Sequence, residues 1–195
     1  MPELTHDEMR RLETELSYIP GKMLVSHLNR MTRVMTTLVG RSEMTYDRLF
    51  RKITGFDPDD QNGALIPMDA VLHDVGVLLQ RFTHRHPFDA GASKSRVHTL
   101  QEVAAKHRVT LRTVRRWAMS GMPLACYRFH DGHHGWGVAD EHLRAFMKAR
   151  ARKTARNGNP LTDVERETIL ERIAALEAQN NATSAQIVRR VTRDS

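Results

Sequence analysis

Apolar residues recur at spacings of three and four along much of the chain, and this spacing constrains the fold more than any other feature. The longest run extends from Met23 to Val39, where Leu24, Leu28 and Met31 share one face of a helix. Aromatic residues make up only 6% of the chain, which favours helices over an aromatic-rich β sandwich. We therefore expect a mainly α fold that opens with a bundle of helices.

Turn-forming and capping residues delimit the first helix. Thr5, with Glu8 three positions later, forms a capping-box pattern that predicts a helix starting near His6. Pro20 and Gly21 interrupt the apolar spacing and end that helix before the long run begins. The sequence thus predicts two consecutive helices at the start of the chain.

The remaining helices of this part follow from the same spacing. Helices are predicted over 42–53 and 69–82, separated by a loop over 55–67 that contains Asp-Pro and Asn-Gly pairs. Residues 1–86 are therefore expected to form an N-terminal helical domain. Small and polar residues over 87–97 indicate a linker to the part that follows.

Positive charge is concentrated in one segment of the chain. The net charge is +7, yet residues 1–97 hold 13 Lys or Arg and 13 Asp or Glu. Residues 98–160 hold 12 basic residues against 4 acidic ones. Such a concentration is the electrostatic footprint of a polyanion binder, nucleic acid first, with a solvated basic surface as the alternative.

Several classes of protein are excluded by what the sequence lacks. A single cysteine, Cys126, rules out an intramolecular disulfide framework and a zinc site of several cysteines, and it fits a reducing cytoplasm. No apolar run approaches the roughly 20 residues of a membrane helix, and the acidic N-terminus lacks the features of a signal peptide. We expect a cytoplasmic, nucleoid-associated protein with no membrane partner.

The segment 99–122, TLQEVAAKHRVTLRTVRRWAMSGM, follows the helix-turn-helix pattern. Thr99 is expected to cap a first short helix, and a tight turn buries Val109. Thr110 then caps a second helix over 110–120. Two helices joined in this way are the core of many DNA-binding domains.

The second of these helices is expected to have two different faces. Val114 and Trp117 turn toward the core, because a helix advances by about 100° per residue. The residues expected on the exposed face are Arg112, Thr113, Arg115 and Arg116. Guanidinium groups on such a face can clamp phosphates or pair bidentately with guanine edges.

A hairpin is expected after the second helix. A short extended run is followed by the glycine-containing turn HDGHHG and a return strand. Residues 125–138 are therefore predicted to form a two-stranded β wing. A further helix is expected from Asp140 on, so that residues 98–156 make up a winged helix-turn-helix domain.

This segment resembles the MerR/excisionase group of winged helix-turn-helix domains over residues 98–150. The resemblance rests on LQEVAAKHRVTLRTVRRWAMSGMPLACYRF and, after the turn, on VADEHLRAFM. It implies that the helix over 110–120 reads the major groove of double-stranded DNA and that the wing over 125–138 touches the flanking backbone. The DNA-binding residues expected are Arg112, Thr113, Arg115, Arg116, Lys106, Arg128, His130, His133 and His134.

The tip of the expected wing departs from this group. It carries His130, His133 and His134 where Arg or Lys is usual, and histidine is mostly uncharged at neutral pH. Together with Cys126, these side chains have spacings that a metal ion tolerates, but successive side chains of a strand point to opposite faces. We therefore predict neither a metal site nor a cofactor.

The last part of the chain predicts a helical pair over 161–195. The stretch ATSAQIVRRV resembles the first helix of a second helix-turn-helix, which favours a fragment of a longer protein over a two-helix tail. The order of parts, with ELSYIP near the start and LTDVERETILERI, resembles a divergent group of bacterial RNA polymerase sigma-factor-like regulators. That resemblance implies RNA polymerase as a partner besides DNA.

A DNA-binding transcription regulator accounts best for the localised charge and the expected domain. Two alternatives stay open. One is a phage-type accessory protein of DNA architecture or packaging, such as an excisionase or small terminase subunit, and the other is a winged helix used only for protein contacts. The sequence contains no phosphate-loop, zinc-protease or nucleophile-elbow motif, so we expect no enzymatic activity.

Overall fold

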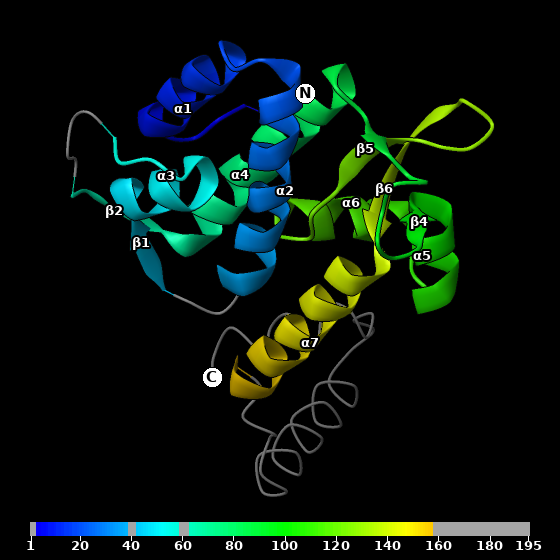
Figure 1. Ribbon diagram of the computed structural model, residues 1–195. Coiled ribbons are helices and arrows are strands. Elements are labelled where there is room, and N and C mark those ends of the chain that lie inside the picture. The colour runs from blue at the N-terminus through cyan, green and yellow to red at the C-terminus, as the bar shows by residue number, and fades with distance from the viewer. Residues whose placement is uncertain (1–2, 39–41, 59–62, 158–195) are drawn as a thin grey trace, which may run out of the picture. The chain divides into compact units, whose positions relative to one another are not determined.

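The computed structural model describes three stretches of the chain, residues 3–38, 42–58 and 63–157. These residues are mainly helical, with two small sheets, which confirms the mainly α fold class (Figure 1). The chain divides into a compact unit over Met1–Ala151 and a second unit over Arg152–Ser195. The helical pair predicted over 161–195 lies outside the described residues.

Most of the predicted helices are confirmed with small shifts in their bounds. The helices are α1 (Asp7–Ser17), α2 (Gly21–Leu38), α3 (Tyr46–Thr54), α4 (Met68–Arg85), α5 (Leu100–His107), α6 (Leu111–Met119) and α7 (Asp140–Asn157). The strands are β1 (Glu43–Thr45), β2 (Leu65–Pro67), β3 (Phe88–Asp89), β4 (Val97–Thr99), β5 (Ala125–Arg128) and β6 (His134–Ala139).

Helix α4 lies at the centre of the first unit. It contacts α1, α2, α6 and β5, and it runs behind α2 in Figure 1. Its side chains Val75, Val77 and Leu78 are all fully buried, although Val77 points away from the face that Val75 and Leu78 share. Gly76 allows the closest approach, since a Cβ there would lie 3.4 Å from the backbone oxygen of Ala118 in α6. Helix α4 therefore joins the N-terminal helices to α6.

A side chain of α4 holds the two residues that directly precede α1. Asp74, whose side chain is fully buried, accepts hydrogen bonds from the backbone N–H groups of Thr5 at 3.0 Å and His6 at 3.1 Å. The hydroxyl of Thr5 also donates to Asp74, at 2.9 Å. The predicted capping box of Thr5 with Glu8 is therefore wrong: His6 is the N-cap and has no side-chain cap bond. The Thr5 hydroxyl instead donates its hydrogen bond to a carboxylate that is distant in the sequence.

Two short strands replace parts of a predicted helix and a predicted loop. β1 and β2 pair antiparallel, with Met44 opposite Ile66, and both side chains are buried. The helix predicted over 42–53 begins only at Tyr46, and the loop predicted over 55–67 ends in a strand. A strand of three residues shows no periodicity of its own, because it is stabilised by a partner that is distant in the sequence.

The second sheet has the strand order β3-β5-β6-β4. The hairpin predicted over 125–138 is present as β5 and β6. Residues 87–97, for which we expected a linker, instead supply β3 and the start of β4, and Phe88 of β3 is buried opposite Tyr127. An isolated hairpin leaves both edges unpaired, so these two strands cover its edges. The boundary predicted at 87–97 thus lies within one compact unit.

The substitution Asp74→Asn should lower the free energy of unfolding by about 2–4 kcal/mol, because it weakens several hydrogen bonds that a buried carboxylate accepts. Burial by itself raises the pKa of Asp74, but hydrogen bonds from His73, Thr5 and His6 outweigh it and hold that pKa below its usual range. The stabilisation is therefore present above about pH 4 and is lost as the pH falls through the lowered pKa.

Urea unfolding at neutral and acid pH measures this effect. The difference in stability between the wild type and Asp74→Asn should shrink in acid. Glu8→Gln, which removes the partner of the predicted capping box, is the control and should leave stability almost unchanged. An equal difference at both pH values would show that the charge of Asp74 does not provide the stabilisation.

Candidate nucleic-acid interface

Helices α5 and α6 both begin at threonine caps. The hydroxyl of Thr99 accepts the backbone N–H of Glu102 at 3.2 Å, and the Glu102 carboxylate accepts the backbone N–H of Thr99 at 2.8 Å, which completes a capping box. The hydroxyl of Thr110 accepts the backbone N–H of Thr113 at 3.2 Å. Between the helices, Arg108 adopts the left-handed conformation with a φ of 52°. Both predicted caps are confirmed, and a short turn joins the helices.

Helix α6 has a buried face and a basic exposed face, as predicted. Val114 and Trp117 are buried. Thr113 is half-buried, with its hydroxyl 3.1 Å from that of Thr110. The exposed cationic side chains of the helix are Arg112, Arg115 and Arg116. We refer to these three residues as the α6 arginines.

The α6 arginines have no acidic partner in the part of the chain that the structure describes. Residues 98–160 contain only four acidic residues, and each lies beside another basic side chain. The pairs are Glu102 with Arg96, Asp131 with His133, Asp140 with His98, Lys106 and Arg144, and Glu141 with His142. The positive charge of α6 is therefore not compensated locally, which concentrates positive potential on its exposed face.

Lys106, a predicted DNA contact, is engaged with Asp140. Its Nζ lies 3.2 Å from Oδ1 of Asp140, and Nε2 of His98 lies 2.7 Å from the same oxygen. Nε of Arg144 lies 2.6 Å from the other carboxylate oxygen. Hydrogen bonds from His98 and Lys106 hold the pKa of Asp140 below its usual range. This cluster fastens β4 and α5 to the start of α7.

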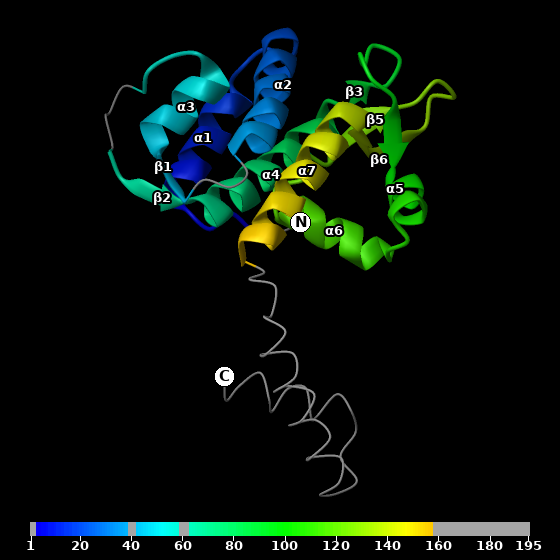
Figure 2. The ribbon, with the colours of Figure 1, turned by 90° about the horizontal axis from the view of Figure 1, so that it is seen from below.

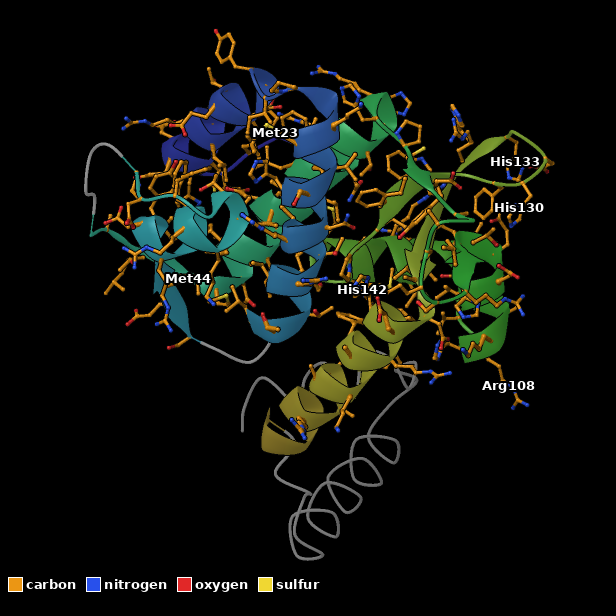
Figure 3. The ribbon with its side chains drawn as sticks, viewed as in Figure 1. Met23, Met44, Arg108, His130, His133 and His142 are labelled. Carbon is orange, nitrogen blue, oxygen red and sulfur yellow. The ribbon has the colours of Figure 1, made fainter. Side chains whose placement is uncertain are left out.

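The predicted wing histidines lie at and beside the tip of the β5–β6 hairpin. His130, His133 and His134 are exposed, and Figure 3 shows the first two together at the tip. His133 pairs with Asp131 and stacks on Phe129, with ring centroids 4.7 Å apart. The tip is thus ordered by its own contacts, and its imidazoles face solvent.

Strand β5 contains Arg128, a predicted DNA contact, and Cys126, considered as a metal ligand. Arg128 pairs with Asp89 of β3 at 3.4 Å, so this predicted DNA contact already has an acidic partner. Cys126 is buried, and burial raises the pKa of its thiol. Among the residues described, no three His, Cys, Asp or Glu side chains lie close enough together to hold a metal ion.

The predicted DNA-binding residues fall into separate groups. The hairpin tip lies apart from α6 in both views (Figures 1 and 2). Figure 3 shows Arg108 beyond one end of α5 and His130 near the other. The α6 arginines and the wing histidines are therefore two distinct surfaces of the first unit.

Sequence reasoning does not identify two further cations near α6. Arg108 is exposed in the turn before α6 and projects outward in Figure 3. Arg150 of α7 places its guanidinium carbon 5.4 Å from the centroid of the Trp117 ring, a cation–π contact. The position of Arg108 in the predicted turn is a signal that could have been used. The contact of Arg150 has no such signal, because Trp117 lies far away in the sequence.

Comparison of the chain with protein-family models gives no match, and comparisons with curated proteins and with solved structures give none either. None of the described helices combines the length and the apolar character needed to cross a membrane. The uncompensated charge of α6 is therefore the main indication of function.

Trp117→Ala should lower the free energy of unfolding by about 3–5 kcal/mol through the cavity it leaves. Trp117 is 4% exposed, and its ring packs against Phe146 and His107. Trp117→Phe should cost clearly less, because the buried indole Nε1 has no hydrogen-bond partner to lose. Urea unfolding followed by circular dichroism compares the two variants. Equal losses would mean that ring volume does not determine stability at this position.

Proposed function

We propose that this chain is a sequence-specific DNA-binding transcription regulator in which residues 98–156 act as a winged helix-turn-helix. One observation carries the proposal: α6 exposes Arg112, Arg115 and Arg116 without an acidic partner among the described residues. An α-helix fits the major groove, where arginine pairs bidentately with guanine. A surface kept only for solubility usually intersperses both signs of charge, so a polyanion partner explains α6 better.

In this proposal, the N-terminal half of α6 reads the bases. Its C-terminal end packs on α4, which leaves the first turns as the free end. Residues near the N-terminus of a recognition helix approach base edges most closely. Arg112 and Thr113 are therefore assigned to base reading, with Arg116 one turn further on, while Arg115 is assigned to a phosphate.

The β5–β6 hairpin serves as the wing and supplies weaker contacts to the flanking DNA backbone through His130, His133 and His134.

A narrower form of the proposal is a sigma-factor-like regulator that also binds RNA polymerase. The order of parts in the sequence supports it. The proposed function involves no enzymatic activity and no cofactor.

The whole chain should bind duplex DNA with a steep dependence on salt. If the α6 arginines, Arg108 and one further cation neutralise four or five phosphates, the slope of log affinity against log salt should be about −4 to −5. Fluorescence anisotropy over a salt series measures this slope. A slope near zero, or no binding at low salt, would refute the proposal.

The α6 arginines should differ in their effect on specificity. Arg112→Ala should cost about 1–3 kcal/mol on the preferred site and relax the preference at one base pair. Arg115→Ala should weaken binding to all sequences alike and reduce the salt slope by about one. Selection of bound sequences from random DNA, followed by anisotropy, separates the two effects.

A matched control is Arg48→Ala, which removes an exposed arginine from α3 and should leave DNA affinity unchanged. If Arg112→Ala and Arg116→Ala both preserve the selected sequence in a folded protein, α6 does not read bases. Tight binding without any sequence preference would support the DNA-architecture alternative instead.

A further inference from the structure

A pocket of about 680 Å³ opens in the first unit, and none of the α6 arginines lines it. Its walls come from α2, from residues 87–94 and from the start of α7, with Tyr127 of β5 also lining it. Figure 3 shows His142 where α7 begins. Binding sites for small molecules have volumes of roughly 300–1,000 Å³, so this pocket has the size of a metabolite site.

Three cationic side chains line the pocket. Arg30 of α2 donates to the backbone oxygen of Thr54, whereas Arg33 of α2 and Lys94 are exposed and have no ion-pair partner in the described part of the chain. Of the two acidic residues in the lining, Asp89 is paired with Arg128 and also accepts the backbone N–H of Gly91 at 2.9 Å. Asp89 is therefore engaged elsewhere and is not the partner of Arg33 or Lys94.

The other acidic residue of the lining lies beside a histidine. Oε1 of Glu141 is 3.6 Å from Nε2 of His142. The remaining ring nitrogen, Nδ1 of His142, is buried and has no hydrogen-bond partner. A buried polar atom without a partner costs free energy, and because Nδ1 is closed off from solvent, a ligand recovers that cost only if the ring turns toward the pocket.

The pKa of His142 indicates the form in which it meets a ligand. Burial lowers this pKa most, Glu141 raises it and Arg33 lowers it further, with a net decrease. His142 is therefore a neutral imidazole at pH 7, which supplies one hydrogen-bond donor or acceptor and no charge. The positive charge of the site comes from Arg33 and Lys94 instead.

The apolar part of the lining includes two aromatic rings, besides Val25, Pro87, Ala92 and Ala139. The rings of Phe88 and Tyr127 lie 5.6 Å apart, and both side chains are largely buried. Small polar side chains complete the wall, namely Ser26, Asn29, Thr32 and Ser93. A pocket with an aromatic side, neutral hydrogen-bonding groups and two free cations suits a ligand that combines a ring, hydroxyl groups and an anionic group.

We infer that this pocket binds a small phosphorylated metabolite of about nucleotide size, with its phosphate held by Arg33 and Lys94 and its polar body within reach of His142. The inference does not depend on the DNA-binding proposal, because the pocket shares none of the α6 arginines. Free phosphorylated compounds and the phosphates of nucleic acid have the same chemistry, so the experiment must separate them.

Isothermal titration of the whole chain with AMP and ribose 5-phosphate tests the inference, with adenosine and ribose as the unphosphorylated counterparts. Both phosphorylated compounds should bind, and their counterparts should bind far more weakly. The double variant Arg33→Ala/Lys94→Ala should weaken AMP binding by about 10- to 100-fold, the effect of losing charge-assisted hydrogen bonds. No heat with any phosphorylated compound would overturn the inference.

Two control variants separate this pocket from other basic surfaces. Arg48→Ala/Lys52→Ala removes the same charge from α3, and Arg112→Ala/Arg115→Ala removes it from α6; both should keep the AMP affinity of the wild type. An equal loss in either control would mean nonspecific attraction and would overturn the inference.

A second experiment measures the affinity of the Arg33→Ala/Lys94→Ala variant for duplex DNA. This DNA affinity should equal the DNA affinity of the control Arg48→Ala/Lys52→Ala, because the pocket binds a free metabolite and does not bind DNA. If the DNA affinity of Arg33→Ala/Lys94→Ala falls as far as the DNA affinity of Arg112→Ala/Arg115→Ala, the pocket is part of a nucleic-acid surface and the inference is wrong. A protein that binds AMP but no DNA would refute the proposed function and leave this inference standing.

Discussion

The burial of α4 on nearly all sides is the constraint on which the rest of the first unit depends. In a helix at that position, each buried polar side chain needs a hydrogen-bond partner, and each side chain must be small enough for the neighbouring element that packs on it. Asp74 does so by accepting the backbone N–H groups of Thr5 and His6 just before α1, and Thr83 does so by accepting the backbone N–H of Cys126 in β5 at 3.0 Å. Gly76 removes the side chain where α6 crosses. One helix thus fixes α1, the sheet and α6 together.

The features that the sequence predicts well are those whose cause is local. The apolar spacing of α2 and α4 and the caps at Thr99 and Thr110 depend on residues within one or two turns. The features it misses depend on distant partners. Asp74, which accepts the backbone N–H of Thr5 before α1, lies 69 residues further along the chain. The strands β1 to β4 are likewise defined by partners that no local pattern indicates.

The same distinction applies to the candidate interface. The exposure of Arg112 and Arg115 follows from helix geometry, because Trp117 on the same helix must face the core. The pairing of Lys106 with Asp140 does not follow from any local rule, since 34 residues separate them. Nor does that of Arg128 with Asp89, 39 residues apart. Sequence alone therefore places the basic residues on the right segment but cannot tell which of them remain unpaired.

Helix α7 carries residues that belong to the pocket and residues that pack behind α6. His142 lines the pocket, and Asp140, two residues earlier, binds His98 and Lys106 of the preceding elements. Further along the same helix, Phe146 packs against Trp117, which forms the buried side of α6. Helix α7 therefore contributes to the pocket, to the Asp140 cluster and to the packing behind α6, and its first two turns must satisfy all three sets of contacts at once.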